Sequence, residues 1–168
     1  LSKVLSPGLR VGWMIAPSEL LSRAVMCKQF SDAHTSTFAQ ATAAQYLKAG
    51  RMPATLDKVR QVYAVRAQTM CDALRQNLGD AISFVQPQGG LFVWASLTGA
   101  GGKVKDGNAF AKMAIEKGVA FVPGTPFFCQ NPDHSTLRFS FATVGEDKIL
   151  EGVDRLKQAM DASVSTSA

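Results

Sequence analysis

A lysine and an arginine lie seven positions apart at the start of the chain, on either side of the Ser-Pro-Gly turn in SKVLSPGLR. The turn is expected to bring the Lys3 amine close to the Arg10 guanidinium. Such a pair suits a ligand that carries both a carbonyl and a phosphate. The amine can form a Schiff base with the carbonyl, and the guanidinium with nearby N–H groups can hold the phosphate. The segment is also compatible with a solvated lysine beside an ordinary turn.

A second arginine that could do chemistry lies in the segment LRFSFA. Strand alternation places Leu137, Phe139 and Phe141 on one face, which the aromatic rings mark as core, and Arg138 and Ser140 on the other. An arginine held on a strand can bind a carboxylate through two parallel charge-assisted hydrogen bonds. The same position also suits a solvated arginine on the open face of a sheet.

Other motif-like segments predict no site. GAGGKV departs from the phosphate-loop pattern, because Leu97 stands where its first glycine should be and Val104 where its Ser or Thr should be. His34 and His134 lie far apart without ligand-spaced partners, so no metal site is expected. The cysteines at positions 27, 71 and 129 form no CxxC pair, which favours reduced thiols in a cytoplasmic protein.

The composition is that of a globular protein, with 46% hydrophobic and 18% charged residues. The net charge is +5, but Lys and Arg are scattered along the chain, so nucleic-acid binding through this chain is not expected. No apolar run approaches the ~20 residues of a membrane span, and the start lacks a signal-peptide pattern. A membrane partner is therefore not expected.

The elements that must position these residues follow from hydrophobic periodicity. Residues 53–78 carry apolar side chains at intervals of three and four, which predicts one long amphipathic helix. Shorter helices are expected at 17–30, 37–48, 108–117 and from 146 onward, and strands at 11–16, 82–85, 91–95, 119–122 and 137–142. The predicted fold class is α/β, with an α+β unit from residue 51 onward whose helices pack on one face of a sheet.

The segment SKVLSPGLRVGW resembles the lysine segment of fold-type I pyridoxal-phosphate aminotransferases of class I/II. It is most similar to the branch of 2-aminoadipate and kynurenine aminotransferases and of the aminotransferase halves of MocR-type regulators. PQGGLFVW, GVAFVPGTPFF and TLRFSFAT match further motifs in the family's order. The resemblance covers nearly the whole chain, and four motifs in order are specific.

The resemblance implies a role for four residues. Lys3 resembles the lysine to which pyridoxal 5'-phosphate is covalently attached and which moves a proton during the reaction. Arg10 resembles the arginine that binds the cofactor phosphate, and Ser2 stands where members often supply another phosphate contact. Arg138 resembles the arginine that binds the substrate α-carboxylate. The implied reaction is transamination between an α-amino acid and a 2-oxo acid, in an enzyme that is usually a homodimer.

The family's chains are more than twice as long as this one, and several of the family's cofactor-binding residues would precede Lys3. The chain is therefore expected to be the C-terminal portion of a larger enzyme and to be inactive alone. Residues 1–50 would be the end of the large cofactor-binding domain, and residues 51–168 the small domain. The alternative is an effector-sensing domain of a MocR/GntR-type transcriptional regulator.

Overall fold

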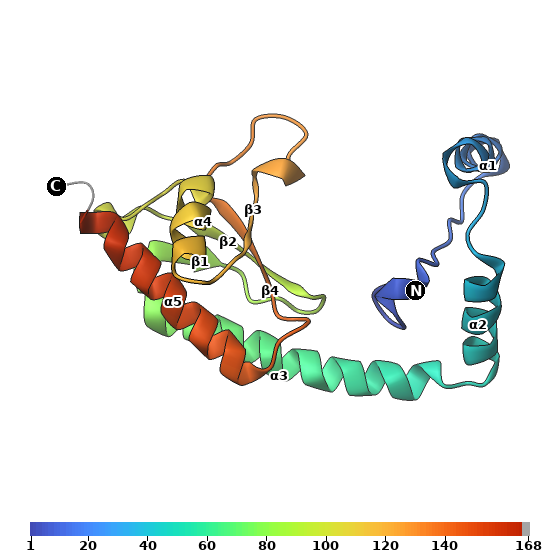
Figure 1. Cartoon of the computed structure of the whole chain (residues 1–168), viewed down its shortest axis with the longest axis horizontal. Coiled ribbons are helices and arrows are strands. Elements are labelled where there is room, and N and C mark those ends of the chain that lie inside the picture. The colour runs from blue at the N-terminus through green and yellow to red at the C-terminus, as the bar shows by residue number, and fades with distance from the viewer. Residues whose placement is uncertain (166–168) are drawn as a thin grey trace. The chain divides into compact units, whose positions relative to one another are not determined.

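The computed structural model describes residues 1–165, which form two compact units. The first unit spans Leu1–Arg60, and the second begins at Gln61 and contains the rest of the described chain. The helices drawn in Figure 1 are α1 (Ser18–Asp32), α2 (Thr37–Lys48), α3 (Met52–Leu78), α4 (Gly107–Glu116) and α5 (Glu146–Ser165). The strands are β1 (Ile82–Phe84), β2 (Phe92–Leu97), β3 (Val122–Pro123) and β4 (Thr136–Ser140). Short 3-10 turns are η1 (Pro7–Leu9), η2 (Gly79–Ala81), η3 (Ala100–Gly102) and η4 (Thr125–Phe127).

The first unit consists of a turn segment followed by helices. The Ser36 hydroxyl accepts a hydrogen bond from the backbone N–H of Ala39 at 3.4 Å and so caps the start of α2. The hydroxyl groups of Tyr46 and Thr55 are hydrogen-bonded and connect α2 to the first turns of α3. The small side chains of Ala39 and Ala43 are buried in α2, and α1 buries none. Local hydrogen bonds therefore shape this unit more than a packed core does.

The strand expected at residues 11–16 is wrong, because this segment has no regular secondary structure. Trp13, Met14 and Ile15 are 71%, 58% and 90% exposed. A strand forms through backbone hydrogen bonds to a neighbouring strand. Within residues 1–60 the structure contains no other strand that could supply them.

The second unit is built on a four-stranded antiparallel sheet with the strand order β1-β2-β4-β3. Arg138 of β4 lies opposite Trp94 of β2 on one side and opposite Val122 of β3 on the other. β3 is shorter than the strand expected at residues 119–122. The backbone N–H of Val119 instead donates to Ala114 O at 3.0 Å, at the end of α4, so the chain joins the sheet later.

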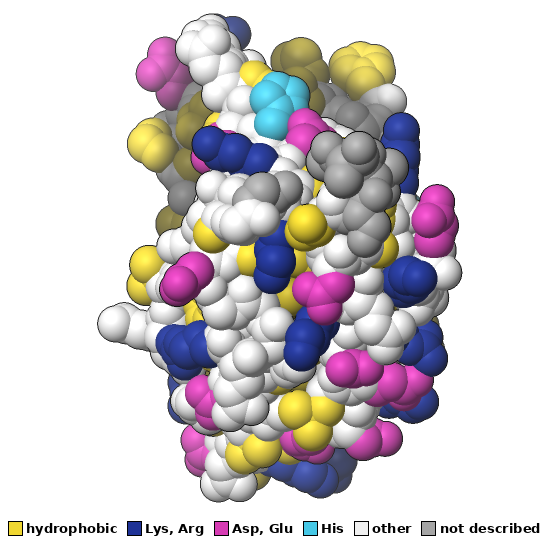
Figure 2. Space-filling view, turned by 90° about the vertical axis from the view of Figure 1, so that its left-hand side faces the viewer, with side chains coloured by type: hydrophobic (Ala, Val, Ile, Leu, Met, Phe, Trp, Pro, Cys, Tyr) yellow, Lys and Arg dark blue, Asp and Glu magenta, His cyan; other side chains and the backbone are white. Residues whose placement is uncertain are grey.

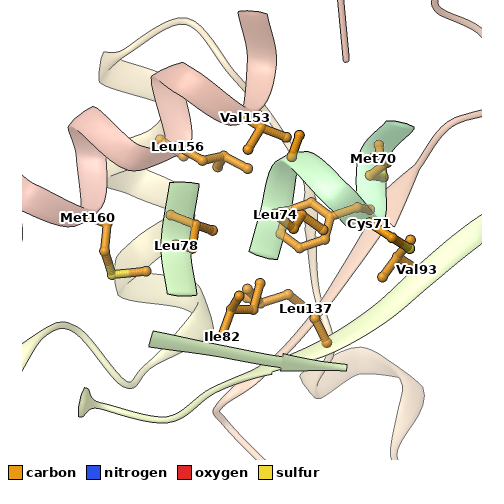
Figure 3. Packing of buried hydrophobic residues seen from close by; sticks show 14 of the residues in the cluster. Met70, Cys71, Leu74, Leu78, Ile82, Val93, Leu137, Val153, Leu156 and Met160 are labelled. Carbon is orange, nitrogen blue, oxygen red and sulfur yellow. The ribbon is translucent and has the colours of Figure 1, made fainter. Parts of the chain in front are cut away.

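Helices α3, α4 and α5 supply the core on one face of the sheet, as predicted. Figure 3 shows Leu74 and Leu78 of α3 and Leu156 of α5 pointing into the same space as Leu137 of β4. These side chains are at most 3% exposed. The six buried residues of α3 lie in its second half, from Ala67 to Leu78, where the predicted periodic face meets the sheet. The opposite face of the sheet carries the side chain of Arg138.

Charges of both signs are mixed on the face of the molecule drawn in Figure 2, where Lys and Arg side chains alternate with Asp and Glu. One such group lies on α5, where Glu151 accepts from Lys148 at 2.7 Å and from Arg155 at 2.5 Å. This face therefore presents no broad surface of one charge. Across the described part of the chain, none of the helices combines the length and apolar character needed to cross a membrane.

Candidate functional site

The first twelve residues form an open hollow around Lys3. The backbone N–H of Leu5 donates to Leu1 O at 2.9 Å and closes a turn, which η1 follows. Pro7 is the first residue of η1, where the missing N–H of proline costs nothing. The residues that line the hollow are Leu1, Ser2, Lys3, Val4, Arg10, Val11 and Gly12.

Two cations and a hydroxyl meet in this hollow. Arg10 Nη1 donates to Ser2 Oγ at 3.3 Å and to Pro7 O at 3.3 Å, and the exposed Lys3 lines the same surface. Phosphate oxygens bind most strongly to charged donors and to additional hydroxyl or N–H groups. The donor set therefore fits a phosphate-bearing ligand, with a primary amine beside it that could attack a carbonyl.

The backbone of Arg10 is strained. Its φ of 51° and ψ of 34° lie in the left-handed region, at the point where η1 ends. A residue with a Cβ pays roughly 1–2 kcal/mol in this region. Strain that persists at a residue with a candidate binding side chain supports a role for that side chain.

The Arg138 guanidinium lies over two aromatic rings on the open face of the sheet. Its Cζ lies 4.3 Å from the centre of the Phe92 ring and 4.5 Å from that of Phe127. Trp94 packs edge-on against Phe127, with the ring centres 5.6 Å apart. Two rings therefore contact the guanidinium, and cation–π attraction holds it in place. A carboxylate that binds this arginine would meet the N–H groups, which point outward in the guanidinium plane.

Arg138 also has an unused donor. Its Nε is buried and has no hydrogen-bond partner. No carboxylate within the described residues forms an ion pair with this arginine. A buried donor without a partner costs about 1–3 kcal/mol, so a carboxylate that supplied the missing acceptor would recover that energy. The geometry thus favours a bound carboxylate over a merely solvated arginine.

A close backbone approach holds η4 and Phe127 beside β4. The N–H of Gly124 donates to Thr136 O at 2.7 Å. A Cβ at Gly124 would lie 2.0 Å from Thr136 Oγ1 and 2.6 Å from Thr136 Cβ. Thr136 is itself buried and donates its hydroxyl to Asp133 O at 2.7 Å. Only glycine therefore fits at position 124, and η4 can lie close enough for Phe127 to stack on Arg138.

Sequence reasoning missed the aromatic contacts of Arg138. Alternation along β2 places Phe92 and Trp94 on one face, a signal that was available in LFVW. That this is the face of Arg138 depends on the pairing of Trp94 with Arg138, which the motif does not reveal. Phe127 reaches the site from a turn, for which periodicity gives no direction.

The candidate residues belong to two separately described groups. Ser2, Lys3 and Arg10 share the hollow of the first unit, and Arg138 with its aromatic neighbours lies in the second unit. The first arrangement suits a phosphate and a carbonyl, and the second suits a carboxylate.

Comparisons with known proteins identify the family of the chain. The model of the family described as aminotransferase class I and II matches residues 1–156. A 2-aminoadipate transaminase of Thermus thermophilus is 41% identical over 159 residues, which are 95% of this chain and 39% of that protein. An HTH-type transcriptional regulator of Bacillus subtilis, YdfD, is 29% identical over 86% of this chain and 29% of its own length.

Solved structures give the same result. The crystal structure of LysN, the α-aminoadipate aminotransferase of Thermus thermophilus complexed with N-(5'-phosphopyridoxyl)-L-leucine, superposes with a TM-score of 0.88 at 38% identity. The match covers 98% of this chain and 41% of that one, so the chain spans about two fifths of the length of these relatives. With a family match over residues 1–156 and a local geometry of the same chemistry, the chain belongs to the class I and II aminotransferases.

Proposed function

We propose that the protein containing this chain transfers an amino group between an α-amino acid and a 2-oxo acid with pyridoxal 5'-phosphate as cofactor. The observation that carries the proposal is the hollow that Lys3 lines and in which Arg10 Nη1 donates to Ser2 Oγ. A phosphate and a carbonyl on one ligand are the two groups that this donor set fits. When bound, pyridoxal phosphate supplies an electron sink for the charge left on the substrate Cα.

The residues of the hollow have different roles in holding the cofactor. Arg10 and Ser2 bind the phosphate through charge-assisted and hydroxyl hydrogen bonds. Lys3 attaches covalently to the cofactor through Nζ. Once not attached, the Lys3 amine would take a proton from the substrate Cα and hold it for return, acting as general base and then general acid.

Arg138 orients the substrate. Its in-plane N–H groups bind the α-carboxylate, and the rings of Phe92 and Phe127 keep the guanidinium from rotating. A fixed carboxylate restricts the substrate to few orientations, which contributes to catalysis by positioning. Aromatic amino acids and 2-aminoadipate are the proposed donors, and 2-oxoglutarate is the proposed acceptor. The names of the relatives support 2-aminoadipate.

The proposed organisation follows the family. Residues 1–50 would belong to the large cofactor-binding domain and residues 51–168 to the small domain of a cytoplasmic homodimer. The chain spans 39% of its Thermus relative, which supports the proposal that the 168 residues alone do not catalyse turnover.

Covalent labelling tests this proposal. The natural protein is incubated with pyridoxal phosphate, reduced with borohydride and digested, and its peptides are analysed by mass spectrometry. We expect a phosphopyridoxyl group on Lys3, its loss in Lys3→Ala, and no comparable labelling of the exposed Lys28. Labelling spread evenly over surface lysines would contradict the proposal.

A regulator is the second candidate function, because regulators such as YdfD match 86% of this chain. The cofactor hollow would then serve to sense an effector. Transfer of an amino group to 2-oxoglutarate by the natural protein would support the enzyme. Cofactor binding without turnover, combined with effector-dependent retention on DNA, would support the regulator.

A further inference from the structure

Arg66 lies on α3 and reaches the chain that leaves β4. Its Nη1 donates to Ala142 O at 2.9 Å, across 76 positions of sequence. Its Nε is buried and has no partner among the described residues, and no carboxylate there forms an ion pair with it. Burying the Arg66 Nε without a hydrogen-bond partner costs free energy. The position of this guanidinium, with its hydrogen bond to Ala142 O, therefore needs an explanation other than solvation at the surface.

The bond fixes the end of the strand that carries Arg138. Phe141 precedes Ala142 and is 1% exposed, and its backbone N–H donates to Leu91 O at 3.2 Å. One turn before Arg66, Tyr63 packs edge-on against the Phe141 ring, with centres 6.1 Å apart. Helix α3 therefore holds the end of β4 at two consecutive residues.

The contacts of α3 with Phe141 and Ala142 lie close along the chain to the residues that hold Arg138. Ser140, two residues before Ala142, is paired with Phe92 of β2. Phe92 is one of the rings that contact the Arg138 guanidinium, with its centre 4.3 Å from Arg138 Cζ. If the strand end loosened, the pairing of Ser140 with Phe92 would loosen first, and the Phe92 ring would no longer hold the guanidinium in one orientation.

We infer that Arg66 is a positioning residue for Arg138: by holding Ala142 O, it keeps the Phe92–Arg138 stack in register. The importance of that position for a substrate carboxylate rests on the proposed function. The effect on Arg138 itself does not, and it can be measured in the 168-residue chain without substrate.

The test compares three variants of the chain. Arg66→Met keeps most of the side-chain volume and removes the donors, and Arg66→Lys keeps a charged donor. Arg60→Met is the control, because Arg60 is 73% exposed on the same helix and forms an ion pair with Asp57 at 3.4 Å. The readout is the NMR signal of the Arg138 Nε–H group, assigned by its loss in Arg138→Lys, together with its hydrogen-exchange rate.

We expect Arg66→Met to accelerate exchange at Arg138 Nε about fivefold, the size expected for the loss of one hydrogen bond, and to broaden its signal. Arg66→Lys should restore part of the protection, and Arg60→Met should leave it unchanged. An Arg138 signal that is unaltered in Arg66→Met would overturn the inference, even if the variant unfolds more easily. If Arg66→Met does not fold, the exchange rates at Arg138 Nε in Arg66→Lys and Arg60→Met decide whether Arg66 positions Arg138.

In the natural protein, Arg66→Met should raise the KM for the amino acid about fivefold with kcat little changed, because the carboxylate contact is made before and during the reaction. A lower kcat at constant KM would contradict a role through Arg138. If the natural protein transfers no amino group, the proposed function fails, and the exchange rates at Arg138 still decide the role of Arg66.

Discussion

A methyl group at Gly124 should loosen the aromatic stack on Arg138. The φ of −77° at Gly124 suits any residue, so Gly124→Ala acts through space alone. The new Cβ would lie 2.0 Å from Thr136 Oγ1, 2.6 Å from Thr136 Cβ and 3.0 Å from the Thr136 carbonyl carbon. The last two atoms belong to a central strand and cannot rotate away. The chain at Gly124 must therefore move, and with it η4.

The cost can be estimated from these contacts. Overpacking of a closed site costs about 1–3 kcal/mol. Rotation of Thr136 to relieve the shortest contact would also break its hydrogen bond to Asp133 O, worth about 1 kcal/mol. We expect Gly124→Ala to lower the free energy of unfolding by about 2–3 kcal/mol, which corresponds to a urea midpoint about 1 M lower.

Urea unfolding followed by circular dichroism and tryptophan fluorescence measures both effects. Trp94 contacts Phe127, so displacement of η4 should change its emission before unfolding begins. Gly89→Ala is the matched control, because a Cβ there meets nothing within 4 Å. Thr136→Ala should recover part of the loss when combined with Gly124→Ala, because it removes the closest atom. Equal midpoints for Gly124→Ala and Gly89→Ala would refute the steric argument.

Three further perturbations have defined outcomes. The free energy of unfolding of Arg10→Gly should exceed that of Arg10→Ala by about 1 kcal/mol, seen as a higher urea midpoint, because glycine accepts the left-handed backbone. Both substitutions should weaken pyridoxal phosphate binding in a titration. Thiol titration of the folded chain should label the exposed Cys27 and Cys129. Cys71 should not be labelled, because burial shields it and raises its pKa, until the chain is unfolded. A hydrogen bond from Lys148 lowers the pKa of Glu151 below its usual 4.5. Its stabilising effect is thus present above pH 4.5 and lost as pH falls through the lowered pKa, and Glu151→Gln should flatten that part of the pH–stability curve.

Periodicity predicted the elements that bury a continuous apolar face. The second half of α3 and the central strands follow their patterns, because side chains such as Leu74, Val93 and Leu137 find a core within the chain itself. The segment 11–16 has a strand-like composition but no pairing partner in the first unit. Backbone pairing depends on a second segment, and composition cannot supply that information.

The candidate site was predictable only where its residues are close in sequence. The turn in SKVLSPGLR indicated that Lys3 and Arg10 are neighbours, since their closeness is local. The stack on Arg138 combines β2, β4 and η4, and it depends on strand register and on the tight packing at Gly124. Both are tertiary properties. A cross-strand partner such as Phe92 becomes a contact only when the register is known.

Several departures from ordinary chain geometry fall on the candidate arginines. Among the described residues, the buried side-chain nitrogen and oxygen atoms without a partner are Nε of Arg66 and Nε of Arg138. Arg10 is one of three non-glycine residues with positive φ, alongside Ala33 and Asn131. A chain selected only for stability would place its donors against acceptors and glycine in the left-handed region. That these arginines carry such costs is best explained if Arg10 and Arg138 bind a charged ligand, as proposed, and Arg66 positions Arg138, as inferred.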